Sequence, residues 1–483
     1  MQSLQQLCRR ALQAGGQRVV EFGGRWYDRS EFASLAQNYW AATDRMSQPT
    51  VAFVATNTPE SLALFLAMLA AGHRVRMLYP FQSSEALCRE IGSINPDIWV
   101  LDELLKDSRV EGRARELGCL LLSVAGMATQ VQDYWSAPCN ARSERELVLL
   151  TSGTTGPAKP FALSYDTILR HYTGNAREQL SPGDARQSDA PTLLYFPISN
   201  ITGLFTTLPA LVLEQPIILL ERFSLDAWLQ YVDTYQPVTS GLPPVAYKMI
   251  LDAQIEPERL ACLSYLGSGA APLNTEVKHS FEDRFNVDIL FSYGATEFGG
   301  PVTRMSPELY SNASDQQKLS QGMPLPGMRV RVVDVDTGVE LDTGQQGRVE
   351  VVSCRMGDDW IVTNDLGSID ADGFVFLYGR VDGAIMRGGF KILPATLEAL
   401  LLQHPAVAEA AVVAIPDSRV GEVPGAAIVL KPEVDSIDAS VLADFLRARL
   451  PAPHLPADWR FVTTLPKTPS LKVSLPDTKS LFT

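Results

Sequence analysis

The sequence predicts an α/β protein whose large N-terminal domain consists of stacked, parallel-type β-sheets with helices, plus a small antiparallel, barrel-like part. A small α+β domain is expected to follow it. Up to about residue 300, short apolar segments alternate with helical segments at the spacing of parallel β-α-β units. After about residue 320 the chain alternates and becomes rich in Val and Gly, which favours antiparallel strands. The 483 residues, 46% of them hydrophobic, suffice for two or three domains with substantial cores.

The N-terminal segment predicts the first β-α-β units. Residues 1–45 have the pattern of a helix, a short hairpin and a second helix, because "VVEFGGRWYDRSEF" places a Gly-Gly turn between two β-rich pieces. The expected elements then follow as strand 50–57, helix 59–73, strand 73–80, helix 83–94 and strand 97–102.

The same alternation returns between residues 145 and 300. Each candidate strand there ends in small or polar residues, at the edge where open α/β sheets bind ligands. The candidate strands are 146–152, 192–198, 216–221, 237–243, 262–269 and 287–294.

The residue pattern of the C-terminal third differs from that of the preceding chain. Residues 327–353 predict antiparallel strands, and residues 368–380 predict a hairpin around Asp372-Gly373. A compact unit of strand, helix, two strands and helix follows, with residues 394–417 at its heart. We place the boundary at Gly379–Asp382, which divides the chain into domains 1–379 and 380–483.

Charge and cysteine usage exclude several classes of protein. The net charge of −14, without a Lys/Arg run, argues against nucleic acid as a main partner. The six cysteines and five histidines are scattered, which argues against a zinc site and for a reducing compartment. The N-terminus lacks the apolar core of a signal peptide, and the longest apolar run, 62–72, is too short to span a bilayer. We expect a soluble, cytoplasmic protein.

The stretch "LLTSGTTGPAKPF", residues 149–161, has the composition of a polyphosphate-binding loop. Its glycines and short side chains leave backbone N–H groups free to face a ligand, and it adds four hydroxyls and one lysine. It is no Walker A loop, because the lysine stands three residues after Gly156 between two prolines that prevent a helix from starting there. Taken alone, the stretch is equally compatible with a solvated turn after a strand.

Six segments together resemble the adenylate-forming (ANL) superfamily. That superfamily includes acyl- and aryl-CoA synthetases, aryl-acid ligases, firefly luciferase and the adenylation domains of peptide synthetases. The resemblance extends from about residue 20 to residue 475. The segments are "TSGTTGPAK" (151–159), "GLPPVAYKM" (241–249), "GSGAAPL" (267–273), "SYGATEFGG" (292–300), "TNDLGSIDADGF" (363–374) with "GRVDGAIMRGGFKILPATLE" (379–398), and "LPKTPSLK" (465–472).

The resemblance implies a site for ATP and Mg²⁺. Thr296 matches the family's α-phosphate hydroxyl and Glu297 its Mg²⁺ ligand, an arrangement usual for magnesium. Tyr293-Gly294 would lie along the adenine; the alternative for this pair is a strand-end turn with a core tyrosine. The flap around the β- and γ-phosphates would comprise Thr151, Ser152, Gly153, Thr154, Thr155, Gly156 and Lys159, and the adenine slot Gly269, Ala270 and Ala271.

The resemblance also assigns roles near the C-terminus. Asp365 matches the carboxylate that accepts both ribose hydroxyls, and Arg380 matches a nearby ribose or phosphate contact. Asp382 falls at the hinge about which the family's small domain swings, so domain 380–483 would be a mobile lid. Lys472 matches the catalytic lysine that this domain delivers to the carboxylate and the α-phosphate.

Three positions depart from the family pattern. Pro160 stands where Gly is usual and would stiffen the flap. Asn364 replaces the Gly of the usual T-G-D, and Asn tolerates positive φ. Leu471 replaces the Gly before the catalytic lysine; leucine resists left-handed angles, so that loop must adopt an allowed conformation or carry strain.

The predicted acid pocket excludes an α-amino acid. Relatives that activate amino acids carry an aspartate that pairs with the substrate ammonium, and Pro197 stands in its place. An unpaired ammonium in a buried pocket would be costly. The mainly apolar wall favours an aryl or medium-sized acyl acid; it would comprise Phe196, Ser199, Asn200, Ile201, Gly203, Leu204, Ala270, Ala295, Phe298, Gly299 and Gly300.

We therefore expect an ATP-dependent acid–thiol ligase that works through an acyl-adenylate. Gly388, Gly389 and Lys391 match the path of pantetheine, which suits coenzyme A or the arm of a separate acyl carrier protein. An alternative of another class is a degenerate protein that binds nucleotide or acyl-adenylate without turnover, of which Leu471 and Pro160 would be signs. The sequence does not determine the acid, the acceptor or the oligomeric state.

Overall fold

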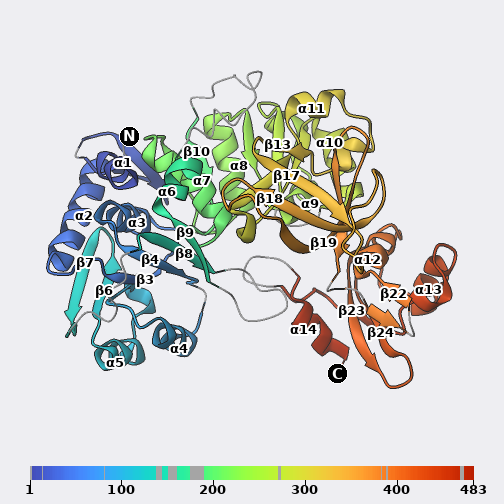
Figure 1. Cartoon of the computed structure of the whole chain (residues 1–483). Helices are drawn as coiled ribbons and strands as arrows, with labels where there is room; N and C mark the ends of the chain where they lie inside the picture. Colours follow the sequence, from blue (N-terminus) through green and yellow to red (C-terminus); the bar gives the residue numbers. More distant parts are fainter. Residues whose placement is uncertain are drawn as a thin grey trace. The chain divides into compact units, whose positions relative to one another are not determined.

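The structure, a computed structural model of the whole chain, forms two compact units (Figure 1). One comprises Met1–Ser240 with Ala295–Gly300, and the other Gly241–Gly294 with Pro301–Thr483. The residues that the structure describes are 3–13, 15–80, 82–136, 144–150, 160–173, 190–269, 273–381, 383, 385–387, 390–467 and 473–482, with only the backbone at 386, 390 and 391.

A seven-stranded sheet organises the first unit. Its five inner strands, β6, β5, β3, β4 and β8, pair in parallel, and the two edge strands pair antiparallel to their neighbours. In spatial order the strands are β7 (Ala128–Asp133), β6 (Leu120–Ala125), β5 (Ile98–Asp102), β3 (Thr50–Val54), β4 (Arg74–Leu78), β8 (Glu146–Leu150) and β9 (Pro160–Ser164).

Helices cover both faces of this sheet (Figure 1). Alternate residues of β3 therefore enter different cores: Val51 and Phe53 pack in the cluster that contains α3, and Ala52 and Val54 in the cluster with α4 and α5. Burial on both faces explains the nearly continuous apolar sequences of β3, β5 and β6. The helices of this layer are α1 (Leu4–Ala11), α2 (Arg29–Thr43), α3 (Pro59–Ala71), α4 (Ser84–Ile94) and α5 (Ser108–Leu117), with the 3₁₀ turn η1 (Glu103–Leu105).

The sequence dictates where α3 begins and ends. Thr58 caps its N-terminus by accepting a hydrogen bond from the Ser61 N–H, and Pro59 occupies the first turn, where no N–H is needed. Gly72 ends the helix at a φ of 79°, a left-handed angle that favours glycine. Between these caps nearly every residue is apolar and buried, as a central core helix requires.

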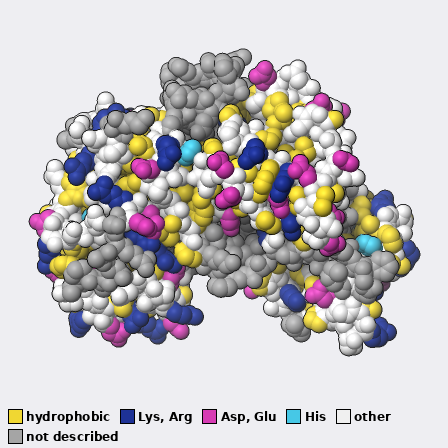
Figure 2. Space-filling model, viewed as in Figure 1, with side chains coloured by type: hydrophobic (Ala, Val, Ile, Leu, Met, Phe, Trp, Pro, Cys, Tyr) yellow, Lys and Arg dark blue, Asp and Glu magenta, His cyan; other side chains and the backbone are white. Residues whose placement is uncertain are grey.

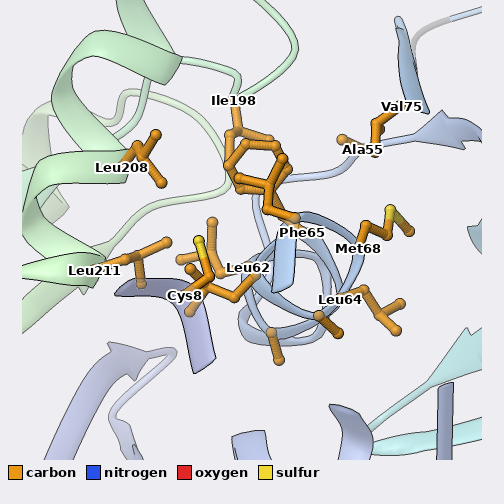
Figure 3. Close-up of a cluster of buried hydrophobic side chains, with 14 of the residues drawn as sticks. Cys8, Ala55, Leu62, Leu64, Phe65, Met68, Val75, Ile198, Leu208 and Leu211 are labelled. Atoms are coloured by element: carbon orange, nitrogen blue, oxygen red, sulfur yellow. The ribbon is translucent and has the colours of Figure 1, made fainter. Parts of the chain in front are cut away.

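A second, four-stranded sheet of this unit has the order β10-β11-β1-β2. Its core joins that of α3: Figure 3 shows Ile198, Leu208 and Leu211 directed toward Leu62 and Phe65. The strands are β10 (Thr192–Leu194), β11 (Ile217–Leu219), β1 (Arg18–Phe22) and β2 (Arg25–Asp28), and the helices α6 (Tyr165–Tyr172), α7 (Ile201–Val212) and α8 (Leu225–Tyr235).

A five-stranded sheet follows in the order β12-β13-β14-β15-β16. Its strands β13 and β14 pair in parallel. The strands are β12 (Thr239–Gly241), β13 (Tyr265–Ser268), β14 (Asp288–Ala295), β15 (Gly300–Arg304) and β16 (Met323–Pro324). The helical segments are α9 (Pro244–Asp252), η2 (Pro257–Leu260), α10 (Thr275–Phe285), η3 (Thr296–Phe298), α11 (Pro307–Asn312) and η4 (Gln317–Leu319).

The C-terminal third contains two further sheets. One is fully antiparallel, in the order β17 (Met328–Val333), β18 (Gly347–Ser353), β19 (Ile361–Ile369) and β20 (Val375–Arg380). The other has the order β22-β21-β24-β23, with β25 on β24, and comprises β21 (Ile385–Arg387), β22 (Phe390–Ile392), β23 (Val407–Asp417), β24 (Gly421–Leu430) and β25 (Asp458–Phe461). Its helical segments are α12 (Pro394–Leu402), α13 (Ala439–Arg447), η5 (Ala452–His454), α14 (Leu475–Lys479) and η6 (Ser480–Phe482).

The surface carries charges of both signs. On the face shown in Figure 2, Lys and Arg side chains are interspersed with Asp and Glu. None of the helices in the described part of the chain combines the length and the hydropathy that crossing a membrane needs.

Candidate active site

Three of the predicted nucleotide-binding residues form one polar cluster. The Tyr293 hydroxyl donates a hydrogen bond to Oδ2 of Asp365 at 2.5 Å. The guanidinium of Arg380 lies 3.8 Å from Oδ1 of the same carboxylate. Asp365 is thus held between a phenol on one oxygen and a cation near the other.

The antiparallel ladder between β19 and β20 places two of these residues opposite each other. Asp365 and Arg380 are direct partners in the register, beside an irregularity that follows Leu366. The Asp365 N–H donates to the Thr363 hydroxyl oxygen at 2.9 Å, which fixes the backbone at the carboxylate. The ladder continues to the bond from the Val381 N–H to the Asn364 carbonyl, 2.6 Å long.

Burial keeps the Tyr293 phenol protonated. The residue is 8% exposed, and burial, followed by the negative charge of Asp365, raises its pKa well above the ordinary value. The phenol therefore remains a hydrogen-bond donor throughout the physiological pH range. The Asp365 side chain is partly exposed, so a ligand can still reach its carboxylate.

Gly269 lies where the predicted adenine slot begins, directly after β13. A Cβ there would stand 2.8 Å from the Ser292 hydroxyl and 3.2 Å from the Ser292 carbonyl oxygen. Because β13 and β14 are parallel neighbours, a side chain at this position would be driven into the next strand. Only glycine lets the two strand ends approach so closely.

The turn between β14 and β15 carries Thr296 and Glu297. The Gly299 N–H bonds to the Thr296 carbonyl at 2.9 Å, and Gly299 and Gly300 take φ values of 68° and 119° that suit glycine. Within this turn the side chain of Glu297 is exposed whereas Phe298 is buried. The exposed carboxylate is therefore accessible, while its neighbour anchors the turn.

Two aromatic residues attach this turn to the predicted acid pocket. The Tyr172 hydroxyl donates to the Gly299 carbonyl at 2.5 Å, and its ring meets Phe205 edge-on, with centroids 5.9 Å apart. A Cβ on Gly300 would stand 3.3 Å from the Phe205 ring. Residues 299–300 and helix α7, which the sequence places in one pocket, are thus brought together by side chains that sequence reasoning missed.

The loop from Tyr195 to Asn200 connects β10 to α7, and a buried amide holds it. Asn57, directly after β3, donates to the carbonyls of Tyr195 at 3.0 Å and Leu220 at 3.4 Å. Its side-chain oxygen accepts the Ile198 N–H at 3.4 Å. Asn57 is the last residue of the predicted strand 50–57, and its one signal in the sequence was a polar residue at the carboxyl end of a buried strand.

Asn200 has a structural role that sequence reasoning left open. Its side chain caps α7 by accepting the Gly203 N–H at 2.7 Å. A Cβ on Gly203 would lie 1.9 Å from the Pro197 carbonyl, so the helix start and the loop are in direct backbone contact. Of the other pocket residues in this region, Ser199, Ile201 and Leu204 are buried and Phe196 stacks on Tyr195.

Several predicted site residues lie outside the described part of the chain, so their roles stay predictions. They are the flap residues Thr151, Ser152, Gly153, Thr154, Thr155, Gly156 and Lys159, the slot residues Ala270 and Ala271, the hinge residue Asp382, the thiol-path residues Gly388 and Gly389 with the side chain of Lys391, and the catalytic Lys472.

The described residues offer no preformed cage for a metal. Nowhere among them do three or more His, Cys, Asp or Glu side chains converge as ligands. Mg²⁺ commonly takes one or two carboxylates and completes its shell with phosphate oxygens and water. The single exposed carboxylate of Glu297 fits that pattern.

Family models identify the chain. The model of the AMP-binding enzyme matches residues 9–356, and that of the AMP-binding enzyme C-terminal domain matches residues 396–472. The chain belongs to the AMP-binding enzyme family. Its membership in the adenylate-forming superfamily, predicted from the six segments, is confirmed, and so is the α/β fold class.

Curated relatives of this AMP-binding enzyme include plant proteins. The chain is 29% identical to "4-coumarate–CoA ligase-like 5" of Oryza sativa subsp. japonica, over 69% of this chain and 61% of that protein. It is 26% identical to "4-coumarate–CoA ligase-like 9" of Arabidopsis thaliana, over 91% of this chain and 81% of the relative. The match thus spans less than two thirds of the rice protein.

Solved structures share the fold. The crystal structure of ATP-bound MatB from Rhodopseudomonas palustris superposes with a TM-score of 0.82 at 23% identity. The superposition covers 99% of this chain and 100% of that one. At this level of identity the likeness establishes the fold alone.

Proposed function

We propose that this AMP-binding enzyme uses ATP and Mg²⁺ to convert an aryl or medium-sized acyl acid into an acyl-adenylate, releasing pyrophosphate. It then transfers the acyl group to the thiol of coenzyme A. The observation that carries the proposal is the cluster of Tyr293, Asp365 and Arg380 in a chain of this family. The names of the relatives, which are CoA ligase-like, support the same reaction class.

The polar cluster suits the ribose of ATP. A carboxylate accepts hydrogen bonds and offers two oxygens, so Asp365 would take the 2′- and 3′-hydroxyls. The Tyr293 phenol would keep the carboxylate from rotating, and the Arg380 cation would balance negative charge on the sugar-phosphate. Tyr293 would also present its ring to the adenine.

A few positioned groups would neutralise the negative charge of the ATP phosphates. The Thr296 hydroxyl would contact the α-phosphate, and Glu297 would hold Mg²⁺, whose charge stabilises the developing pyrophosphate when bound. The flap from Thr151 to Lys159 would close over the β- and γ-phosphates. Lys472 would orient the carboxylate for in-line attack on the α-phosphorus, with positioning as its main contribution.

The acid would lie between α7 and the turn that follows β14. The contacts of Tyr172 and Phe205 bring these two segments together and place two aromatic rings beside them. Pro197 supplies no charge for a substrate ammonium, which disfavours α-amino acids. In the second half-reaction Gly388, Gly389 and Lys391 would border the pantetheine path. A cytoplasmic location remains a prediction.

Acid-dependent exchange of labelled pyrophosphate into ATP tests the proposal directly. A panel of aryl, acyl and α-amino acids should show exchange with members of the first two groups only. Coenzyme A and a pantetheinylated carrier protein, added separately to the same mixtures, then identify the acceptor. Absence of exchange across the whole panel would favour a binding protein without turnover.

A further inference from the structure

The predicted magnesium ligand, Glu297, lies in a turn that has little stiffness of its own. Gly299 and Gly300 follow Glu297 after one intervening residue, and their φ values are 68° and 119°. Glycine has more conformational freedom than any other residue, so two in succession allow a turn to adopt other shapes unless outside contacts hold it. The position of the Glu297 carboxylate therefore depends on contacts that the turn makes with other segments.

A buried hydroxyl supplies one such contact. The Tyr172 hydroxyl donates to the Gly299 carbonyl at 2.5 Å, and the Gly299 N–H closes the turn onto the Thr296 carbonyl at 2.9 Å. Gly299 is thus held at its N–H by the turn itself and at its carbonyl by a side chain from outside. The Tyr172 ring also meets Phe205 edge-on, and a Cβ on Gly300 would stand 3.3 Å from the Phe205 ring.

Helix α6 gives Tyr172 a fixed place. Tyr165, Ile168 and Tyr172 lie on one face of the helix, and all three are buried in the core that contains α3. Tyr172 itself is 1% exposed. A side chain packed this closely keeps one rotamer, so its hydroxyl is a fixed point for the Gly299 carbonyl.

The same helix follows the predicted phosphate flap along the chain. Residues 151–159 lie between Leu150 and Pro160, which pair across β8 and β9, and α6 begins directly after β9. Tyr172 thus connects the helix next to the flap with the turn that carries Glu297. A nucleotide whose phosphates and metal contact both segments needs them at a constant separation, because the reacting groups must be held in line.

We propose that Tyr172 is a positioning residue for magnesium binding: its hydroxyl fixes the Gly299 carbonyl and so holds the Glu297 carboxylate where it meets Mg²⁺ on the ATP phosphates. The inference rests on the proposed function and adds to it a buried residue that contacts neither nucleotide nor metal. Tyr172→Phe removes the hydrogen bond and keeps the ring in its packing. The variant should therefore bind Mg²⁺·ATP less tightly, whereas its affinity for metal-free ATP should stay the same.

Equilibrium binding of ATP tests the proposal without turnover. Isothermal titration calorimetry with ATP in EDTA and with ATP in excess Mg²⁺ gives the factor by which the metal strengthens binding. Tyr172→Phe should reduce this factor by about 3- to 10-fold and leave the affinity for metal-free ATP within about 2-fold of wild type. An undiminished factor in the variant would overturn the role of Tyr172 and leave the proposed function standing. Wild-type protein that binds ATP equally well with and without Mg²⁺ would instead contradict the proposed function.

Tyr165→Phe is the matched control. Tyr165 lies on the same helix and is 6% exposed, and its hydroxyl donates to the His73 carbonyl at 2.7 Å rather than to the turn. Both variants remove one buried hydrogen bond of α6 and should lower the Tm by similar amounts. Only Tyr172→Phe should weaken the effect of Mg²⁺ on ATP binding. An equal loss of that effect in both variants would show that it follows stability rather than position, and would overturn the proposal.

A double-mutant cycle shows whether Tyr172 acts through Glu297. Glu297→Gln removes the charged ligand, so most of the strengthening by Mg²⁺ should be lost. If Tyr172 positions that ligand, adding Tyr172→Phe should reduce the remaining Mg²⁺ effect by less than about 2-fold. Losses that multiply across the two substitutions would mean that Tyr172 acts elsewhere, and would contradict its assignment as a positioning residue for Glu297.

Discussion

At the residue scale, the bond between Tyr293 and Asp365 makes a prediction about nucleotide recognition. Tyr293→Phe keeps the ring but removes the donor that holds the carboxylate. We expect the KM for ATP to rise roughly 3- to 10-fold, on the order of 1 kcal/mol, with little change in kcat or in the KM for the acid. Initial rates of pyrophosphate exchange at varied ATP give these constants.

A nucleotide analogue distinguishes this role from a loss of packing. If Tyr293 acts through Asp365 on the ribose, the preference of the enzyme for ATP over 2′-deoxy-ATP should shrink in Tyr293→Phe. Tyr231→Phe is the control, because it removes a buried hydroxyl that donates to the Pro191 carbonyl at 2.7 Å rather than to Asp365. An undiminished preference in Tyr293→Phe would argue against the positioning role.

The residue scale also shows what the sequence could and could not supply. The motifs marked Tyr293, Asp365 and Arg380 as site residues, and the structure brings these three together. The bonds between them could not be predicted, because they depend on the register of β19 against β20 and on side-chain directions. Asn57 carries no motif, and only its three contacts with distant segments reveal its task.

At the element scale, the start of α7 depends on the absence of a side chain at Gly203. Gly203→Ala would place a Cβ 1.9 Å from the Pro197 carbonyl, so the helix and the loop must separate. We expect a loss of about 1–3 kcal/mol in the free energy of unfolding and a higher KM for the acid. Denaturant titration and steady-state rates measure the two effects.

Gly112→Ala provides the matched control for this element. Gly112 lies inside α5, where an added Cβ would meet no atom within 4 Å. There the same substitution should stabilise the protein by roughly 0.5–1 kcal/mol, because alanine in a helix interior is more stable than glycine. Equal effects at both positions would show that the contact with Pro197 is unimportant.

Glu398 of helix α12 should make the free energy of unfolding depend on pH. Burial raises the pKa of Glu398 from 4.5 to about 7, although its carboxylate accepts the Val412 N–H at 2.8 Å. The folded state therefore keeps a proton that the unfolded state has lost, so this contribution to stability is complete below about pH 4.5 and disappears as the pH rises through 7.

Glu398→Gln should remove that dependence, since glutamine stays neutral and can still accept the N–H bond. The variant should match wild type near pH 4.5 and exceed it at pH 8 by on the order of 1–3 kcal/mol. Urea titrations of both proteins at a series of pH values give the difference. A difference that is flat across pH would mean that Glu398 titrates normally.

Local sequence patterns predicted the positions of most helices and strands. Where a predicted element differs from the structure, tertiary contacts explain the difference. The predicted strand 50–57 and helices 59–73 and 83–94 correspond to β3, α3 and α4, because periodicity and caps agree there. The predicted strand 192–198 is shortened to Thr192–Leu194, since Asn57 draws the following residues into a loop. The segment from α5 to β7 was not predicted, and its edge strand β7 is mostly exposed.

At the scale of the whole molecule, single substitutions should affect the two half-reactions, adenylate formation and thioester formation, separately. Lys472, as a predicted catalytic residue, acts on the carboxylate and the α-phosphate. Lys472→Ala should therefore abolish adenylate formation, so that its rate falls by about 100-fold or more. Thioester formation from supplied acyl-AMP should be spared. Single-turnover assays of each half-reaction provide the measurement, and equal loss of both would contradict this division.

The predicted hinge gives the converse result. Asp382→Pro should restrict the backbone where domain 380–483 is expected to swing, so adenylate formation should persist while thioester formation falls. A normal rate of thioester formation in this variant would remove the hinge assignment. The domain boundary at Gly379–Asp382 itself stays a prediction that such variants can examine.

The order of motifs along the chain made the family and the fold class predictable, because a shared catalytic site constrains the same segments throughout a family. The specificity of this chain was less accessible. The predicted pocket residues Pro197 and Asn200 act through backbone geometry and helix capping, which a motif does not report.

The contact between Gly203 and Pro197 has a consequence for redesign of the enzyme. A library that randomises every pocket position together would include many destabilised members, because any side chain at Gly203 forces the helix start and the loop apart. Diversity concentrated at the half-buried positions Phe196 and Ala295, with Asn57 and Gly203 left constant, would instead sample new substrates on an intact scaffold.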